Sequence, residues 1–375
     1  MAKKFNISII GVKGYPYVYG GYETFIKEIS ERLSYKYNIT IYCHRSLFSN
    51  RPKSINGINL TYIPTIETKI LSQPIHSFFS IIHACFSKTD LILVVNSANG
   101  PFGIIPKIFK IPTVINVDGL EWLRPKWKGL GSIYYRFASK MATLFYDQII
   151  NDSDEMRKVY LDLFKRDSKV IAYGANTRES KSSDLIKKWN LDQREYYLVV
   201  GRLIPDNNAD LVIDGFLKSS SRKKLVIVGD VPYKDSYASE IKKMTDKRLI
   251  FTGYVKDQNI LTELYQNCYV YIHGHEFGGT NPTMIKAMAH GCAILALDTV
   301  FNQEMLQNGK FGIFFKKEIL SITKMIEYCE KENIIMDNLR QQSVKGITKK
   351  YNWDYVTAQY SEVFKSLVTQ RNKIG

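Results

Sequence analysis

The chain has 375 residues, too many for one compact hydrophobic core, so its length predicts two domains. Hydrophobic residues make up 45% of it, an ordinary share for a globular protein, and no apolar window is long enough to predict a membrane span. The formal net charge of +16 favours a negatively charged partner.

The positive charge is concentrated in the first half of the chain. Residues 1–180 hold 24 Lys and Arg against 14 Asp and Glu, and residues 122–140 combine basic and aromatic residues without an acid. Such a surface attracts phosphates or anionic lipid headgroups. We expect an anionic membrane surface as the partner and no nucleic acid, because no nucleic-acid-binding motif is present. A generic solvated charged face is the open alternative.

Cysteines and the N-terminal sequence both favour a cytoplasmic protein. The five cysteines are scattered and form no C-x-x-C pair, which predicts free thiols rather than a disulfide or zinc framework. Two lysines near the N-terminus lead directly into a strand-like run without a cleavable apolar region, so export is not expected.

The first half alternates predicted strands and helices. Strands are expected at 6–10, 39–43, 58–63, 91–95, 113–117, 148–150 and 169–172, and helices at 22–33, 75–86, 132–145 and 154–164. This alternation predicts a parallel sheet with helices on both faces.

A polar segment at 173–183 is the best domain boundary, and the alternation restarts after it. Strands are expected at 196–200, 224–228, 249–251, 270–272 and 293–297, helices at 209–217, 236–244, 258–266 and 282–290, and a helical tail at 319–368. We therefore expect two doubly wound domains, 1–178 and 179–352, with a cleft between them and a helix at 353–375.

The first glycine-rich loop lies between the first strand and the first helix. Gly20 and Gly21 let the backbone approach a ligand closely, and the helix N-terminus behind them favours a phosphate. Glu23 lies in the first helical turn, where it either complements the helix dipole or contacts a ligand.

Two further loops follow predicted strands. Arg202 comes directly after a strand and Gly201, a position from which a guanidinium can offer a bidentate charge to a diphosphate; a solvated surface arginine is the alternative. In the segment 116–122, the carboxylates of Asp118 and Glu121 could contact sugar hydroxyls, or Asp118 could cap a turn.

The stretch 271–291 is a strand, a glycine-rich loop and a helix that begins at Pro282. Such a turn opening onto a helix N-terminus is a natural anion site, although an ordinary capped connection is the alternative. His273 and His275 are expected to point to opposite sides of an extended segment, so no metal site is predicted there.

Several segments, in this order, resemble the glycosyltransferases of family 4, and more closely the rhamnosyltransferase-like enzymes of bacterial capsule and O-antigen synthesis. They are GGYETF at 20–25, NVDGLEW at 116–122, VGRLIPDNN at 200–208, HGHEFGGTNP at 273–282 and AMAHG at 287–291. The tail NWDYVTAQY at 352–360 resembles the helix that crosses back to the first domain in this fold. The resemblance covers essentially the full length.

The resemblance implies an α/β GT-B fold, with two Rossmann-like domains facing across a cleft, an acceptor-binding first domain and a donor-binding second domain. It implies retaining transfer of a sugar from a nucleotide diphosphate to a hydroxyl. dTDP-L-rhamnose is the expected donor and a lipid-diphosphate-linked glycan the expected acceptor, at the inner face of the plasma membrane. No cofactor or metal is expected, because the protein's own cations neutralise the diphosphate.

The resemblance also implies roles for individual residues. Asp118 stands where many members carry a histidine facing the donor sugar, and with Arg202 and Glu276 it forms the expected catalytic set. The donor-binding residues are Gly20, Gly21, Arg202, Asn207, Gly278, Gly279, Thr280, Asn281 and Lys286, and the acceptor-side residues are Glu23, Glu121 and Trp122.

Two positions depart from the family pattern. Asn207 stands where many members have a lysine, and Lys286 stands where a glutamate usually holds the nucleotide ribose. These departures leave open a UDP- or GDP-hexose donor, or a non-catalytic subunit that only binds a nucleotide sugar.

Overall fold

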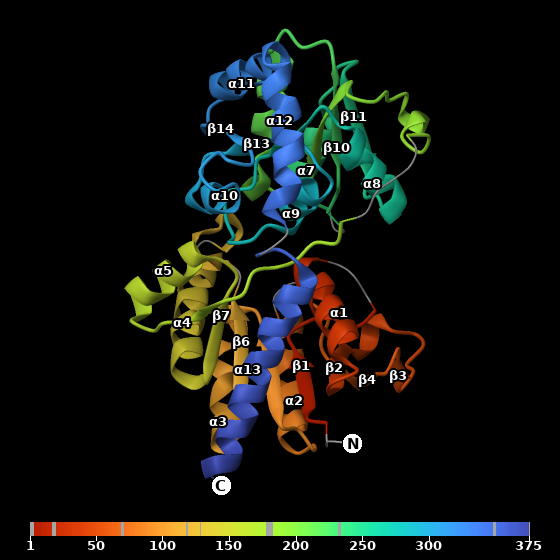
Figure 1. The fold of residues 1–375 in the computed structure, drawn as a ribbon. Helices are drawn as coiled ribbons and strands as arrows, with labels where there is room; N and C mark the ends of the chain where they lie inside the picture. Colours follow the sequence, from red (N-terminus) through yellow and green to blue (C-terminus); the bar gives the residue numbers. More distant parts are fainter. Residues whose placement is uncertain are drawn as a thin grey trace. The chain divides into compact units, whose positions relative to one another are not determined.

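The structure is a computed structural model that describes residues 4–16, 20–68, 71–117, 119–127, 129–177, 183–231, 234–347 and 350–374 (Figure 1). The chain forms two compact units. Unit 1 comprises Met1–Tyr173 and Trp353–Gly375, and unit 2 comprises Gly174–Asn352.

Unit 1 is built on an eight-stranded sheet with the order β3-β4-β2-β1-β5-β6-β7-β8. Only the β3–β4 pair is antiparallel; in the parallel part, Ile9 lies beside Ile41 of one neighbour and Leu93 of the other. The strands are β1 (Asn6–Ile10), β2 (Asn38–His44), β3 (Ser54–Ile55), β4 (Ile58–Ile63), β5 (Leu91–Val95), β6 (Thr113–Val117), β7 (Gln148–Asn151) and β8 (Lys169–Val170).

Helices connect and cover this sheet. They are α1 (Gly21–Leu33), α2 (Ser72–Cys85), α3 (Ile104–Ile108), α4 (Leu130–Phe145), α5 (Asp154–Phe164) and α13 (Trp353–Ile374). The central strand β5 is buried at every residue, the pattern of a parallel strand covered on both faces.

The C-terminal helix α13 packs back onto unit 1, as predicted (Figure 1). The ring of Tyr360 lies 5.2 Å from that of Phe25 on α1, and its hydroxyl accepts a hydrogen bond of 2.8 Å from Asn116 Nδ2. The Tyr37 hydroxyl, at the end of α1, lies 2.8 Å from Ser361 Oγ.

Unit 2 contains a six-stranded parallel sheet with the order β11-β10-β9-β12-β13-β14. Its strands are β9 (Tyr196–Val200), β10 (Lys224–Val228), β11 (Leu249–Gly253), β12 (Val270–His273), β13 (Ile294–Leu297) and β14 (Ile313–Phe315). Its α-helices are α6 (Ala209–Lys218), α7 (Ser236–Lys243), α8 (Gln258–Asn267), α9 (Pro282–Ala289), α10 (Val300–Met305), α11 (Ile319–Lys331) and α12 (Asn333–Ser343). The two doubly wound sheets confirm the predicted α/β fold class.

The predicted helical tail is wrong in one respect: three helices replace one. Glu332, with φ −102° and ψ 55°, separates α11 from α12, and residues 344–352 separate α12 from α13. The sequence pattern did not predict α3, α10 or β14. These elements have only three to six residues, too few to repeat a helical or strand periodicity.

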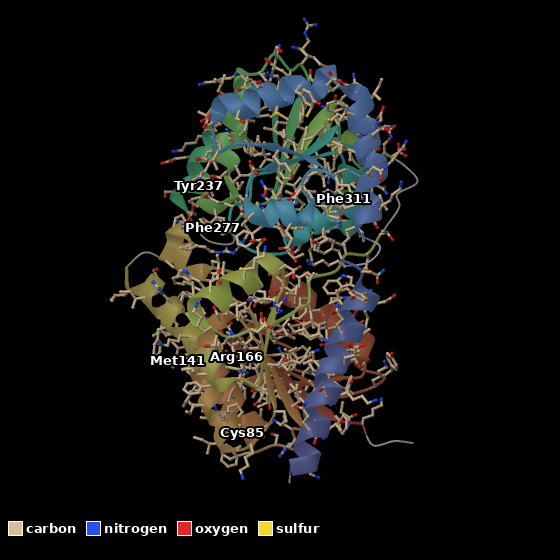
Figure 2. The ribbon with its side chains drawn as sticks, turned by 60° about the vertical axis from the view of Figure 1, so that its left-hand side comes forward. Cys85, Met141, Arg166, Tyr237, Phe277 and Phe311 are labelled. Atoms are coloured by element: carbon tan, nitrogen blue, oxygen red, sulfur yellow. The ribbon has the colours of Figure 1, made fainter. Side chains whose placement is uncertain are left out.

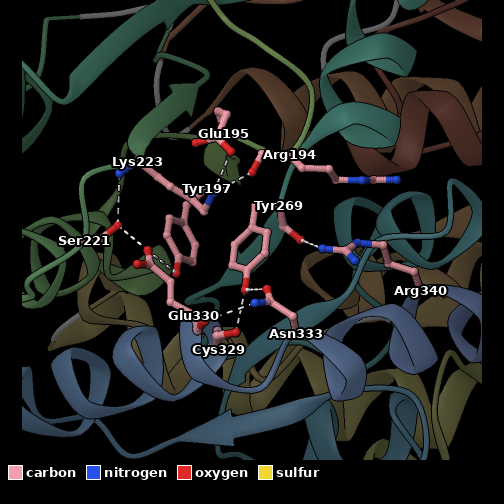
Figure 3. A network of polar contacts seen from close by, with 10 residues as sticks. All are labelled: Arg194, Glu195, Tyr197, Ser221, Lys223, Tyr269, Cys329, Glu330, Asn333 and Arg340. Atoms are coloured by element: carbon pink, nitrogen blue, oxygen red, sulfur yellow. Dashed lines mark hydrogen bonds and ion pairs between the residues drawn. The ribbon is translucent and has the colours of Figure 1, made fainter.

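A polar network closes the edge of the unit 2 sheet at which the strands begin (Figure 3). The Tyr269 hydroxyl donates to the Cys329 carbonyl at 2.5 Å and lies 2.8 Å from Asn333 Oδ1. The Tyr197 hydroxyl contacts Glu330 Oε1 at 3.2 Å, and Arg340 Nη2 donates to the Tyr269 carbonyl at 2.8 Å. These bonds fix α11 and α12 against the sheet.

Candidate donor site at the carboxyl edge of unit 2

The strand order of unit 2 reverses between β9 and β12, which are paired neighbours in the sheet. In doubly wound sheets, ligands bind beyond the carboxyl ends of the strands at such a reversal. The loop after β9 carries Arg202 and Asn207, and the loop after β12 carries residues 274–281. The structure therefore brings the two predicted donor loops of this unit together.

Close backbone packing joins the two loops. A Cβ on Gly274 would lie 2.5 Å from the Asn207 carbonyl oxygen, so only glycine fits there. Asn208, in the left-handed region at φ 51°, donates from Nδ2 to the Gly274 carbonyl at 2.8 Å. The Glu276 amide donates to the Asp206 carbonyl at 3.0 Å, so the loops form one braced structure.

Arg202 and Asn207 have different roles in this structure. The Arg202 side chain is exposed, and no described residue forms a hydrogen bond or ion pair with its guanidinium. Asn207 is half-buried, and its Nδ2 donates to the Arg202 carbonyl at 2.7 Å. Asn207 thus shapes the loop, while Arg202 is the cation that the loop presents to solvent.

The loop after β12 ends at the N-terminus of α9. Gly278 adopts φ +115°, a conformation that favours glycine, and Pro282 occupies the first turn of the helix. Asn281 is the N-cap: its Oδ1 accepts from the Thr283 amide at 3.0 Å. Gly279 and Thr280 are buried beside this cap. A glycine-rich turn at a helix N-terminus has the geometry of an anion site.

A chain of hydrogen bonds fixes the cap from beneath. The Tyr271 hydroxyl donates to Thr283 Oγ1 at 3.0 Å, and Thr283 Oγ1 donates to Asn281 Oδ1 at 2.8 Å. His273 Nδ1 lies 3.0 Å from the Tyr271 hydroxyl, so the directions agree when His273 carries its proton on Nδ1. The side-chain nitrogen of Asn281, Nδ2, in turn forms a hydrogen bond with His275 Nδ1. The sequence did not reveal this chain of contacts.

The predicted divergence of the two histidines is wrong. Their ring centroids lie 4.4 Å apart, because residues two positions apart on an extended segment share a face. Burial lowers the pKa of His273 well below its usual value, so its ring is neutral. His275 Nε2 lies 2.6 Å from where a Cβ on Gly201 would be, which explains the glycine before Arg202.

The predicted catalytic residue Glu276 and the predicted donor-binding residue Lys286 are both engaged in contacts within unit 2. Glu276 Oε2 forms an ion pair of 2.6 Å with Lys317 Nζ. Lys286 is half-buried one turn into α9, and its carbonyl accepts from the ring and amide of His290.

Unit 1 has its own reversal of strand order, between β1 and β5. The loop after β1 leads to Gly20, the extended N-cap of α1, and to Gly21, the first residue of α1. The Glu23 carboxylate lies beneath this loop, where its Oε1 accepts from the Lys13 amide at 3.4 Å. Burial raises its pKa. Glu23 is therefore placed to brace the loop.

The remaining predicted residues follow β6. Asp118 lies outside the described residues. Glu121 forms an ion pair of 2.9 Å with Arg124 Nε and accepts from Trp127 Nε1 at 2.9 Å. The Trp122 ring packs within 6.2 Å of Tyr160 on α5. In this structure both Glu121 and Trp122 are engaged in local packing.

The described part of the chain contains neither a metal-binding cluster nor a membrane-spanning helix. No group of three or more His, Cys, Asp and Glu side chains there is arranged to hold a metal ion. None of the described helices combines the length and the apolar character needed to cross a bilayer.

Two family models match the chain, one for each unit. Residues 181–346 match the model of the glycosyl transferases group 1, and residues 4–176 match a domain of unknown function, DUF1972. An uncharacterized glycosyltransferase of Methanocaldococcus jannaschii, MJ1069, is 24% identical over 97% of this chain and 99% of its own length.

Solved structures share the fold over nearly the whole chain. Alr3699/HepE of Anabaena, in complex with UDP, has a TM-score of 0.76 at 16% identity and covers 97% of this chain and 100% of its own. Sucrose-phosphate synthase of Thermosynechococcus elongatus has a TM-score of 0.83 at 15% identity, with 98% and 100% covered. These likenesses show the GT-B fold. The family matches assign residues 181–346 to the glycosyl transferases group 1, which is family 4, and residues 4–176 to DUF1972, so the chain is a glycosyltransferase whose first unit is a DUF1972 domain.

Proposed function

We propose that this glycosyltransferase transfers L-rhamnose from dTDP-rhamnose to a hydroxyl of a lipid-diphosphate-linked glycan, with retention at the anomeric carbon. Unit 2 binds the donor, and unit 1 binds the acceptor and faces the inner surface of the plasma membrane. The observation that carries the donor assignment is Arg202 at the switch point of unit 2: its side chain is exposed and has no partner among the described residues. The preceding Gly201 lies against His275, which bonds the N-cap of α9.

Different residues have different roles in the proposed donor site. Arg202 and the 278–281 loop hold the diphosphate, while Asn281 is kept in register by its contacts with Thr283 and His275. Gly20 and Gly21 complete the proposed set of phosphate-contacting residues. Asp118 and Glu276 are the residues assigned to the sugar, and this role requires Glu276 to leave Lys317 when the donor binds.

The proposed reaction needs no protein nucleophile. The acceptor oxygen bonds to the anomeric carbon as the bond from that carbon to the β-phosphate oxygen breaks. The departing phosphate takes the proton of the acceptor hydroxyl and leaves as the nucleoside diphosphate. Arg202 stabilises the charge that grows on this phosphate, and electrostatic stabilisation of this kind is usually the largest catalytic contribution.

A UDP-hexose is the second candidate donor. The structurally similar HepE has been solved with UDP and with UDP-glucose, and Lys286 departs from the usual ribose-binding glutamate. A GDP-hexose is a third candidate donor. A non-catalytic nucleotide-sugar-binding subunit is the alternative motivated by Asn207 and Lys286.

A donor screen tests the proposal. Thermal unfolding is measured with dTDP-rhamnose, UDP-hexoses and GDP-hexoses, because a ligand that binds the folded state raises its stability by mass action. The best donor is then incubated with a lipid-linked acceptor, and the anomeric configuration of the product is read by NMR. Greatest stabilisation by dTDP-rhamnose with a retained product supports the proposal. Stabilisation without turnover supports the binding subunit.

A further inference from the structure

Four neighbouring segments of unit 1 contain no carboxylate. The helix α2, the 3-10 segment Ser97–Gly103, α3 and α4 pack against one another. Their sequences contain no Asp or Glu, but they include Lys107, Arg136 and Lys140. By contrast, α1, α5 and α13 all carry acids. Figure 2 labels Cys85 on α2 and Met141 on α4.

The same helices expose large apolar side chains. Of the 24 exposed large hydrophobic residues that the structure describes, 18 belong to unit 1. Ten of them lie on or directly after α2, α3 and α4: Phe79, Phe86, Ile104, Ile108, Phe109, Leu130, Ile133, Tyr134, Phe137 and Leu144. Exposed apolar groups concentrated in this way indicate an interaction surface.

Aromatic contacts connect part of this surface into one patch. The ring of Phe86, which is 77% exposed, lies 5.1 Å from that of Phe109 at the end of α3. Phe78 contacts both Phe79, at 5.3 Å, and Phe102, at 5.8 Å. Lys107 Nζ donates to the Leu144 carbonyl at 2.9 Å, which joins α3 to the end of α4.

A groove of about 550 Å³ runs along α2 within this patch. Its lining is Ile63, Pro64, Phe79, Ile82, His83, Phe86 and Ser87. The span from Phe79 to Phe86 covers roughly 10 Å of helix at 1.5 Å per residue. An apolar slot of this length has the shape and chemistry to hold part of a hydrocarbon chain.

Exposed cations lie next to the groove. Lys88 directly follows the lining residue Ser87, and Lys110 directly follows Phe109. Apolar side chains flanked by lysines, on helices that carry no carboxylate, match the chemistry of an anionic bilayer surface.

We infer that the face formed by α2, α3 and α4 docks on an anionic lipid bilayer, and that the α2 groove takes the hydrocarbon chain of a lipid. This inference rests on the proposed function only in that a lipid-linked acceptor requires the enzyme at a membrane. It assigns the contact to particular residues on one side of unit 1, beyond a general attraction of its positive charge.

Vesicle sedimentation tests the docking face. The full chain is mixed with vesicles of phosphatidylcholine alone or of equal parts phosphatidylcholine and phosphatidylglycerol. We expect sedimentation with the anionic vesicles only, and a loss of about thirtyfold in partition for Phe86→Ser, the equivalent of about 2 kcal/mol for one buried phenylalanine. Lys88→Gln is expected to lose about fivefold.

A matched control comes from unit 2. Ile334 on α12 is 78% exposed, nearly the same as Phe86, so Ile334→Ser changes apolar exposure equally and should leave vesicle binding unchanged. Equal binding by Phe86→Ser and the wild type would overturn the inference. So would a dimer of the wild type, measured by ultracentrifugation, that Phe86→Ser disrupts, because a second copy would then cover the face.

Quenching of tryptophan fluorescence tests whether a lipid chain occupies the groove. Phe86→Trp places a reporter at its lining, and lipids with brominated acyl chains should quench that tryptophan, but not one introduced by Ile334→Trp. Equal quenching of the two variants would contradict occupation of the groove. The thermal stabilisation produced by the donor is measured on the wild type and on the same variants. If the donor stabilises the wild type but the wild type does not bind vesicles, the docking face is wrong and the proposed donor chemistry stands.

Discussion

At the two edges of the unit 2 sheet, similar polar side chains have different surroundings. Where the strands begin, Tyr269 bonds to α11 and α12, and Glu330 to the Tyr197 and Ser221 hydroxyls (Figure 3). Where the strands end, Arg202 has no described side-chain partner. The first edge pairs these hydroxyls and the Glu330 carboxylate within the protein and so contributes to stability. The second leaves a cation exposed on a braced loop, an arrangement suited to a ligand.

Substitution of Arg202 should have the largest effect on activity. Arg202→Ala is expected to lower kcat by about 10²–10³-fold, since removal of one donor to a developing oxyanion has this effect. The free energy of unfolding should change by less than about 0.5 kcal/mol, as is usual for exposed side chains. Steady-state kinetics and urea denaturation check both statements. Arg202→Lys, which keeps the charge but loses the bidentate geometry, should retain part of the activity; full activity in Arg202→Ala would remove the distinction between the edges.

The opposite edge should show the opposite result. Tyr269→Phe removes the hydroxyl that contacts Cys329 and Asn333, and it should lower the free energy of unfolding by about 1–2 kcal/mol. The kcat of the folded enzyme should not change. Chemical denaturation and kinetics on the same preparation provide the test. A tenfold loss of kcat in this variant would show that the two edges are not functionally separate.

The pH dependence of stability reports the buried histidines. Burial holds the pKa of His273 well below its usual value and that of His76 at about 3. Below about pH 6.5, the unfolded chain takes up protons at these positions that the folded chain does not. The free energy of unfolding should therefore fall as the pH drops from 6.5, by at most about 1.4 kcal/mol per pH unit for each histidine.

The comparison of wild type with His76→Gln isolates this contribution, because the variant lacks one titrating group. Its free energy of unfolding should depend less steeply on pH between about 6 and 4. The buried Glu23 acts in the other direction, since its raised pKa makes stability fall as the pH rises. Identical slopes for wild type and variant would contradict the neutral state of His76.

The smallest effect is expected beneath the cap of α9. Tyr271→Phe removes the hydroxyl between His273 and Thr283, and should lower both stability and donor affinity modestly, by about 1 kcal/mol each. Calorimetric titration with the donor nucleotide and denaturation measure the two changes. A loss of stability with unchanged affinity would mean that the hydrogen-bond chain supports the core and not the site.

Sequence periodicity predicted most of the fold because parallel strands such as β5 are continuous apolar runs and helices such as α1 show a clear apolar face. It failed for α3 and β14, which are too short to repeat a pattern. The loops that carry Arg202 and Gly278 were found from their glycines. The chain of contacts from His273 to Asn281 was not found, because it depends on hydrogen bonds between side chains whose directions the sequence does not specify.

The binding position of the donor nucleotide tests the central claim most directly. A crystal structure with dTDP or UDP should show the diphosphate within hydrogen-bond distance of the Arg202 guanidinium and of the backbone of residues 278–281. A nucleotide bound elsewhere, with Arg202 still exposed to solvent, would contradict the assignment of the carboxyl edge of unit 2 as the donor site.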